Sequence, residues 1–297
     1  MGTGVAIGAG WGLDRLIGEP PTAVHPVARF GSAMTALEGR MYAPTRRAGA
    51  IHASIGIGAA VAVGLAANRI VGPRLAVGAA TAICVAGRML AAEAVAVLTL
   101  LDGGDVEGAR GRLGGLVGRD TTSLDEAAIV RAVIESVAEN TVDAVVAPLC
   151  WAAVAGAPGV LVHRAVNTLD AMVGHRNERY ERFGWASARA DDVMNYVPAR
   201  VAALAVAVVR PRRAAVIWHI VRRDAHQHPS PNGGVIEAAT AAALGVRLGG
   251  ENRYGTAVEN RGVLGDGDLP TLADGRRAIR LLSGAGAIVA LALAVVR

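Results

Sequence analysis

Lysine is absent from this sequence of 297 residues, so all 30 basic residues are arginines. The Walker A pattern of a phosphate-binding loop requires a lysine, and its absence excludes that motif. Ser230 lies outside any G-x-S-x-G context, which argues against a serine nucleophile. The sequence therefore excludes a P-loop as the phosphate-binding site and argues against acyl transfer through a serine nucleophile.

Aromatic residues are also scarce, at 3% of the chain. The arginines lie between apolar runs and beside carboxylates, without the interleaved aromatic side chains on which nucleic-acid bases stack. The net charge of +5 therefore does not indicate a nucleic-acid partner. Anionic lipid head groups or phosphate-bearing substrates explain the basic excess better.

Only two cysteines are present, Cys84 and Cys150, and both lie in apolar stretches. We interpret them as buried small hydrophobic residues, which predicts neither a disulfide framework nor a metal site. A positively charged N-terminal region is lacking, and Asp14 and Arg15 interrupt the first apolar run. No cleavable signal peptide is therefore predicted.

Apolar residues, in contrast, make up 53% of the chain, and the mean hydropathy is +0.39. The 38 glycines and abundant alanines suit the close helix contacts of a membrane bundle, although a large alanine-rich soluble helical protein could share this composition. Several runs approach the length of a membrane span. These runs are 51–68, 75–101, 144–162 and 281–296, with a shorter one at 201–209. We predict about four to six membrane segments by the length criterion.

Polar blocks at roughly 102–141, 164–200 and 222–280 separate these apolar runs. No internal repeat or low-complexity linker divides the chain, so residues 1–297 are predicted to form a single domain. The predicted fold class is all-α: a polytopic membrane helical bundle with polar interfacial helices and loops.

The block 119–141 contains the sequence pattern of a helix N-terminus. Ser123 followed by Glu126 has the capping-box pattern, and the predicted helix runs toward Asn140. Arg131, Glu135 and Glu139 are spaced by four residues and therefore lie on one stripe of that helix.

Acidic and amide residues recur as four short clusters beside the apolar runs. The clusters are Glu135, Glu139, Asn140 and Asp143; Asn167 and Asp170; Asp191, Asp192 and Asn195; and Ser230, Asn232 and Glu237. Carboxylates and amides are hard oxygen ligands of the kind that hold Mg²⁺ with substrate phosphates, and nearby arginines can clamp phosphate oxygens. The alternative is a set of solvated helix faces held by surface ion pairs. By contrast, the spacing of His226 and His228, followed by Pro229, predicts an exposed loop rather than a pair of metal ligands.

The four clusters belong to longer ordered motifs, which together resemble the CobD/CbiB family, the adenosylcobinamide-phosphate synthases. The motifs are DRLIGEPPTAVHPVARFG (14–31), GRDTTSLDEAAIVRAVIESVAENTVDAVVAPL (118–149), RAVNTLDAMVGHRNERYERFGWASARADDVMNYVPAR (164–200), HPSPNGGVIEAATAAALGVRLGG (228–250) and LGDG (264–267). The resemblance covers nearly the whole chain.

The resemblance implies a polytopic membrane enzyme of cobalamin biosynthesis. Its expected reaction is ATP-dependent amide formation, an acid–amine ligation that joins (R)-1-amino-2-propanol or its phosphate to the propionate carboxylate of adenosylcobyric acid. The expected product is adenosylcobinamide or its phosphate, with ATP as co-substrate and Mg²⁺ as the metal. The expected location is the cell membrane, with the active site on the cytoplasmic face where ATP is found. Further expected partners are membrane lipid and other cobalamin-assembly enzymes.

Roles within this reaction are inferred from residue chemistry. The predicted catalytic residues are Glu135, Glu139, Asp143, Asp191 and Asp192. The predicted metal ligands are Asp170, Asp191 and Asp192. The predicted substrate-binding residues are Arg119, Asn140, Asn167, Asn195, Arg200, Ser230, Asn232 and Glu237.

Two other functions share part of this pattern. Asp191-Asp192-x-x-Asn195 and Asn167-x-x-Asp170 echo the aspartate-rich sites of Mg²⁺-dependent polytopic prenyltransferases. Carboxylates within membrane segments also occur on the proton paths of non-enzymatic sensors and transporters. The prenyltransferase alternative does not explain the Ser-Pro-Asn segment or the long matching stretches.

Overall fold

The computed structural model describes residues 2–20, 24–175, 177–254 and 257–296. The fold is an all-α polytopic membrane bundle, as predicted, to which one two-stranded sheet is added. The described residues contain five helical segments long and apolar enough to cross a membrane. These segments are Arg46–Val71, Pro73–Asp102, Glu126–Val173, Trp185–Val209 and Leu272–Val296. Their number lies within the predicted four to six.

The chain divides into two compact units. The first comprises residues 1–86, 143–195 and 290–297, and the second comprises residues 87–142 and 196–289. Because the chain passes between the units several times, each unit is built from segments distant in sequence. The single domain predicted for residues 1–297 stays a prediction.

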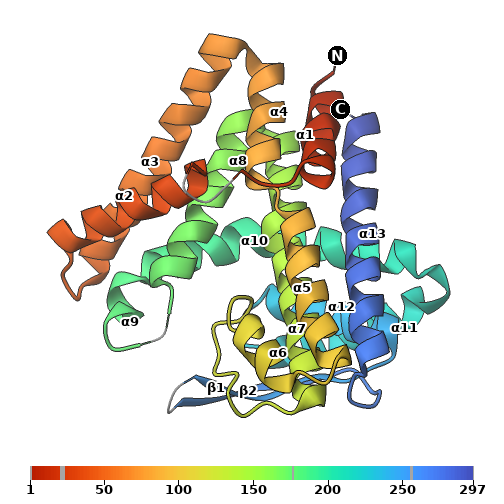
Figure 1. Ribbon diagram of the computed structural model, residues 1–297. Helices are drawn as coiled ribbons and strands as arrows, with labels where there is room; N and C mark the ends of the chain where they lie inside the picture. Colours follow the sequence, from red (N-terminus) through yellow and green to blue (C-terminus); the bar gives the residue numbers. More distant parts are fainter. Residues whose placement is uncertain (1, 21–23, 176, 255–256, 297) are drawn as a thin grey trace. The chain divides into compact units, whose positions relative to one another are not determined.

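The first unit contains α1 (Thr3–Leu16), α2 (Pro26–Met41), α3 (Arg46–Val71), α4 (Pro73–Cys84), α8 (Ala147–Val173), α9 (Tyr180–Phe183) and the start of α10 (Trp185–Val209). The helices α3 and α4 form a hairpin that turns at Gly72 (Figure 1). Gly64 brings α3 against α8, because a Cβ atom there would lie 2.6 Å from the Cα of Pro158. Small residues at such contacts are typical of membrane bundles.

The helix α8 reverses direction at Gly156. This glycine has φ +62° and ψ −149°, a backbone conformation essentially restricted to glycine. A Cβ atom at Gly159 would lie 2.5 Å from the carbonyl oxygen of Trp151, although eight residues of straight helix span about 12 Å. The apolar run predicted at 144–162 is therefore a helical hairpin, and Pro158 lies in the first turn after the reversal, where proline is tolerated.

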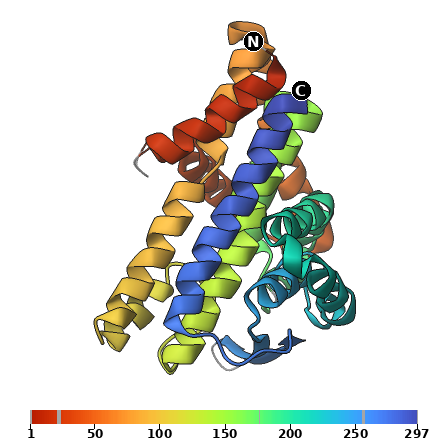
Figure 2. The ribbon, with the colours of Figure 1, turned by 90° about the vertical axis from the view of Figure 1, so that its right-hand side faces the viewer.

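The second unit contains α5 (Gly87–Asp102), α6 (Val106–Leu113), α7 (Glu126–Thr141), the rest of α10, α11 (Ala214–Asp224) and α12 (Gly233–Leu244). Short 3₁₀ turns lie at Pro211–Arg213 and Ala225–Gln227, and most of α13 (Leu272–Val296) completes the unit. Figure 2 shows α13 running beside α7, and a Cβ atom at Gly275 would meet Leu98 of α5 and Val130 of α7.

The helix α7 confirms the predicted segment, but its start differs from the prediction. The structure begins the helix at Glu126, and the Asp125 carboxylate accepts the N–H of Ala128 at 2.8 Å. The predicted cap at Ser123 is therefore wrong. Asp125 takes the cap position because it immediately precedes the first helical residue, where its side chain reaches an N–H that lacks a helical partner.

The sheet was not anticipated. It pairs β1 (Leu248–Tyr254) with β2 (Ala257–Leu264) in an antiparallel hairpin, with Leu248 opposite Leu264. Leu248 and Leu264 are buried, and the register shifts between Gly249 and Glu251.

Candidate functional site

In the second unit, Glu135 is the centre of a buried ionic network. The Arg119 guanidinium lies 2.8 Å from one Glu135 oxygen, and the N–H of Gly249 donates to the other at 2.8 Å. Arg131 lies 3.8 Å from Glu135 on the same helical stripe, as its spacing predicts. Glu135 therefore has its carboxylate oxygens occupied by partners from α7, from the segment before it and from β1.

One turn further along α7, Glu139 meets residues from three other segments. The His228 Nε2 atom lies 3.8 Å from a Glu139 oxygen and 3.4 Å from a Glu237 oxygen. The Arg261 guanidinium lies 3.5 Å from Glu139 and 3.8 Å from Glu237. We call Glu139, His228 and Glu237 the carboxylate–histidine cluster.

Burial decides the electrostatics of this cluster. Glu237 is fully buried in α12 and His228 is 6% exposed. Burial raises the pKa of Glu237 to about 8, and the nearby Glu139 and Glu135 carboxylates add to this effect. Burial lowers the pKa of His228, but the Glu237 and Glu139 carboxylates outweigh burial and raise it overall. The carboxylates therefore favour the protonated form of His228.

The structure corrects the prediction of an exposed loop at His228, because this residue is buried. His226 is exposed, but His228 folds inward because its Nδ1 accepts the N–H of Ser230 at 3.0 Å. The Ser230 hydroxyl in turn accepts the N–H groups of Asn232 at 3.2 Å and Gly233 at 3.1 Å, at the start of α12. These local bonds form a tight turn that spacing analysis does not detect.

Arg200 anchors the same turn. Its guanidinium donates to the Asn232 side chain at 3.1 Å and to the Pro231 carbonyl at 3.2 Å, and it stacks over the Tyr196 ring at 3.6 Å. Arg200, Ser230 and Asn232 were predicted to bind substrate. The structure brings them together, and their observed contacts position the loop that carries His228.

A polar cavity of about 90 Å³ lies in this unit. Its lining includes Arg119, Glu135, Glu139 and Arg261. Asn140 lies one residue beyond Glu139, and its amide donates to the Ser136 carbonyl at 2.9 Å. Two guanidinium groups and two carboxylates therefore line the cavity, and Arg119 and Glu135 among them are paired with each other.

In the first unit, Asn195 joins a second group of predicted residues. Its amide donates to Asp143 at 3.0 Å and to Asp191 at 3.0 Å, while its oxygen lies 2.9 Å from the buried His163 ring. Asn167 also donates to Asp191, at 3.3 Å. We call Asp143, Asn167, Asp191 and Asn195 the aspartate–asparagine cluster.

Asp143 reaches this cluster from an unusual backbone. It lies in a π-helical turn, Val142–Val146, where the chain passes from α7 into α8. Wide turns of this kind are rare and recur at functional sites. The helix α10 contributes both Asp191 and Asn195, which are one turn apart.

The metal set predicted from Asp170, Asp191 and Asp192 stays a prediction. Asp192 is half-buried and lies 3.7 Å from the exposed Arg189. Among the residues that the structure describes, only the carboxylate–histidine cluster brings three His, Cys or carboxylate ligand atoms within 4.8 Å of one another.

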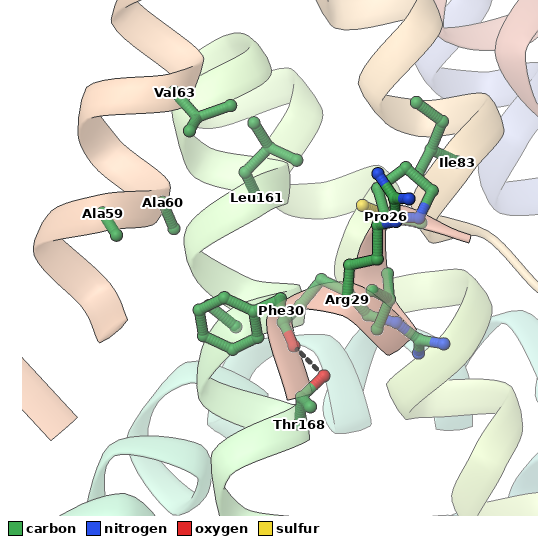
Figure 3. A pocket seen from close by; sticks show the side chains of 13 residues that line it. Pro26, Arg29, Phe30, Ala59, Ala60, Val63, Ile83, Leu161 and Thr168 are labelled. Carbon is green, nitrogen blue, oxygen red and sulfur yellow. Dashed lines mark hydrogen bonds between the residues drawn. The ribbon is translucent and has the colours of Figure 1, made fainter. Parts of the chain in front are cut away.

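An apolar cavity of about 350 Å³ also lies in the first unit (Figure 3). Side chains from α2, α3, α4 and α8 line it, including Phe30, Val63, Ile83 and Leu161. None of the predicted site residues lines this cavity. Cys84 does, and both cysteines are free thiols, as predicted.

Three residues of these clusters were missed at the sequence level: His163, His228 and Arg261. Each meets its partner across 32 or more residues of chain, as in the pairs His163–Asn195, His228–Glu139 and Arg261–Glu139. The spacing of residues within one helix or strand cannot predict pairs so distant in sequence. His163 carried one usable signal, because it follows an uncharged run directly and lies four residues before Asn167.

The fold and these clusters define a polytopic helical membrane protein with buried, carboxylate-rich polar sites. The family model described as CobD/Cbib protein matches residues 7–282, and the chain belongs to this family. A Mycobacterium tuberculosis (strain ATCC 25618 / H37Rv) protein named "Cobalamin biosynthesis protein CobD" is 46% identical over 95% of this chain and 92% of its own length. Relatives with the same name from Geobacter metallireducens and Clostridium perfringens are 40% and 38% identical, over 95% and 92% of this chain and 93% and 88% of their own lengths. No solved structure matches the chain.

Proposed function

We propose that this protein is a membrane enzyme of cobalamin biosynthesis that joins an aminopropanol unit to the propionate carboxylate of adenosylcobyric acid. Membership of the CobD/Cbib family across residues 7–282 carries the proposal, together with relatives named for cobalamin biosynthesis. The same membership favours this function over a prenyltransferase or a membrane sensor or transporter.

The proposed chemistry proceeds in two balanced steps. The carboxylate oxygen attacks the γ-phosphorus of ATP, which gives an acyl phosphate and ADP. The amine of aminopropanol, or of its phosphate, then attacks the acyl carbon, and the amide forms as inorganic phosphate leaves and the amine loses a proton to a base. Both steps involve anionic phosphate groups, so positive charge and hydrogen-bond donors at the site are the main requirement.

The residues present suit these requirements. Asp143 and Asp191, both held by Asn195, offer the one or two carboxylates that Mg²⁺ takes from a protein when phosphates supply other ligands. Mg²⁺ bound there would neutralise the charge of the nucleotide phosphates. In the other unit, Arg119 and Arg261 line a polar cavity and suit an anionic group such as a phosphate or carboxylate. A cytoplasmic position of the active site is part of the proposal, because ATP is supplied there.

The test is conversion of adenosylcobyric acid by membranes that contain this protein, with ATP, Mg²⁺ and either aminopropanol or aminopropanol phosphate. Mass spectrometry of the corrinoid identifies the product. We expect Asp191→Asn to lower the rate on the order of 100-fold, the usual loss when one charged group that stabilises the reaction is removed. Asp102→Asn is the matched control, because Asp102 forms an exposed pair with Arg276 at 2.7 Å outside both clusters.

The nucleotide products test the chemical route separately. The acyl-phosphate route yields ADP and inorganic phosphate, whereas AMP and pyrophosphate would require an acyl-adenylate instead. Absence of any amide product with both amines, from protein that is folded and inserted in the membrane, would refute the proposed function.

A further inference from the structure

The carboxylate–histidine cluster of the second unit combines a histidine with two acidic residues, of which Glu139 lines the polar cavity. We propose that Glu139, His228 and Glu237 bind a divalent transition-metal ion of the Zn²⁺ type. This inference goes beyond the proposed function, whose Mg²⁺ accompanies the nucleotide, and it does not depend on that function.

The ligand atoms have the separations that such an ion requires. With bonds of about 2.0–2.1 Å, two ligands of a tetrahedral Zn²⁺ ion lie about 3.4 Å apart. The His228 Nε2 atom lies 3.4 Å from Glu237 and 3.8 Å from Glu139, and one ligand atom from each residue lies within 4.8 Å of the others. Small side-chain rotations would therefore bring all three onto one ion.

The orientation of the buried groups points to a ligand between them. Glu237 is fully buried, and within the described part of the chain neither of its oxygens takes part in a hydrogen bond. The His228 Nε2 atom also has no hydrogen-bond partner there, although Glu237 is within 3.4 Å. Buried polar groups normally find partners, and a cation in the space that these atoms face would satisfy all of them.

Ser230 can support His228 as a ligand through a change of tautomer. In the structure the His228 Nδ1 atom accepts the Ser230 N–H at 3.0 Å, but it also lies 3.3 Å from the Ser230 carbonyl oxygen, to which an Nδ1–H group would donate. Zn²⁺ at Nε2 selects that second tautomer, which is the usual one of a metal-binding histidine. Gly233 keeps the space open, because a Cβ atom there would lie 2.8 Å from both a Glu139 oxygen and the His228 ring.

The ligand set selects the kind of metal. Imidazole with carboxylates suits Zn²⁺ and its first-row neighbours, whereas Mg²⁺ prefers oxygen ligands and retains several waters. Glu139 and Arg261 line the cavity of about 90 Å³, which is large enough for water. Three protein ligands with a position open to water is the arrangement of catalytic rather than structural zinc sites.

The experiment measures metal binding directly. The full-length protein, without a polyhistidine tag, is purified in detergent, stripped with a chelator and exposed to Zn²⁺, and bound metal is counted by mass spectrometry. We expect one Zn²⁺ per chain and a higher thermal unfolding midpoint on binding. Titration with Co²⁺ should give the visible absorption of a low-coordinate nitrogen–oxygen site.

Variants locate the ion. Glu237→Gln and His228→Asn should each weaken Zn²⁺ binding at least 100-fold, while Asp102→Asn, outside both clusters, should leave the affinity unchanged. Gly233→Ala offers a further variant that keeps every ligand, and it should weaken binding because its methyl group fills the site. Size-exclusion chromatography and tryptophan fluorescence check that each variant is folded.

Two results would overturn the proposal. The first is wild-type protein that holds no Zn²⁺ above background, in which case the cluster is an ion network neutralised by Arg261 and a protonated His228. The second is Zn²⁺ binding that Glu237→Gln and His228→Asn leave intact. Neither result bears on the proposed amide-forming reaction. Conversely, a protein that shows no amide formation in the synthesis assay can still bind Zn²⁺, so the two proposals are tested separately.

Discussion

A single carboxylate, Asp224, links the end of α11 to the segment that follows β2. It is 2% exposed and accepts hydrogen bonds from Arg223 at 2.6 and 2.8 Å and from the N–H of Gly265 at 2.9 Å. The hydrogen bonds from Arg223 lower the pKa of Asp224, although burial opposes them, and the Gly265 N–H lowers it further.

We predict that Asp224→Asn lowers the free energy of unfolding by about 2–3 kcal/mol at neutral pH, because the amide turns an N–H₂ group toward donors in a buried site. The folded-state pKa lies below the ordinary aspartate value of 3.8, so this stabilisation is present above that pH and is lost as pH falls through the folded-state pKa. Thermal unfolding in detergent at several pH values measures the difference. It should be largest near neutral pH and shrink below about pH 4.

Asp266→Asn is the control for this change. Asp266 binds the same Arg223 guanidinium, at 2.6 Å, but its side chain is 65% exposed. An exposed ion pair contributes about 0–1 kcal/mol, so this variant should unfold nearly as the wild type does. Equal losses in the two variants would contradict the assignment of the effect to burial.

Residue roles were only partly predictable from the sequence. The stripe of Arg131, Glu135 and Glu139 follows from helical spacing, and the structure confirms it. The pairing of Arg119 with Glu135 and of His228 with Glu237 does not follow, because these pairs depend on which segments meet in the fold. The metal site predicted from the chemistry of Asp170, Asp191 and Asp192 stays a prediction.

At the scale of elements, hydropathy located the apolar helices better than it located their ends. The run 281–296 is part of a helix of 25 residues, because the more polar residues from Leu272 onward continue the same helix. The β-hairpin was not predictable from periodicity. Its strands are rich in glycine and charged residues, and backbone pairing rather than an alternating apolar pattern defines them.

The reversal inside α8 depends on one glycine. A Cβ atom at Gly156 would meet nothing within 4 Å, so a substitution there changes the backbone energy without a steric clash. We predict that Gly156→Ala destabilises the fold by about 1–3 kcal/mol, because its φ of +62° with ψ of −149° is strained for any residue with a side chain. The thermal unfolding midpoint in detergent measures this cost.

Gly58→Ala in α3 is the matched control, because a Cβ atom there also meets nothing within 4 Å. Gly58 has ordinary helical geometry, so alanine should stabilise the helix by roughly 0.5–1 kcal/mol. If both substitutions shift the midpoint in the same direction, the reversal at Gly156 does not have the backbone conformation described.

At the scale of the whole molecule, large apolar side chains are exposed along the candidate membrane helices. Val61 and Leu65 of α3, Leu204 of α10 and Leu291 of α13 are each at least 36% exposed. A soluble protein rarely exposes apolar surface so extensively, whereas a bilayer makes such exposure favourable. The polar clusters, in contrast, are buried or half-buried, and charges near a membrane are usually paired.

We therefore predict that Val61→Arg reduces insertion of the protein into membranes. Val61 is 36% exposed near the middle of α3, and an arginine at the centre of a span costs about 2.5–3.5 kcal/mol on insertion scales. The yield of folded protein extracted from membranes, followed by fluorescence-detected size-exclusion chromatography, should fall markedly. Val263→Arg is the control, because Val263 is 48% exposed on β2, outside the candidate spans, and arginine there should be tolerated. Equal yields from the two variants would show that this face of α3 meets water rather than lipid.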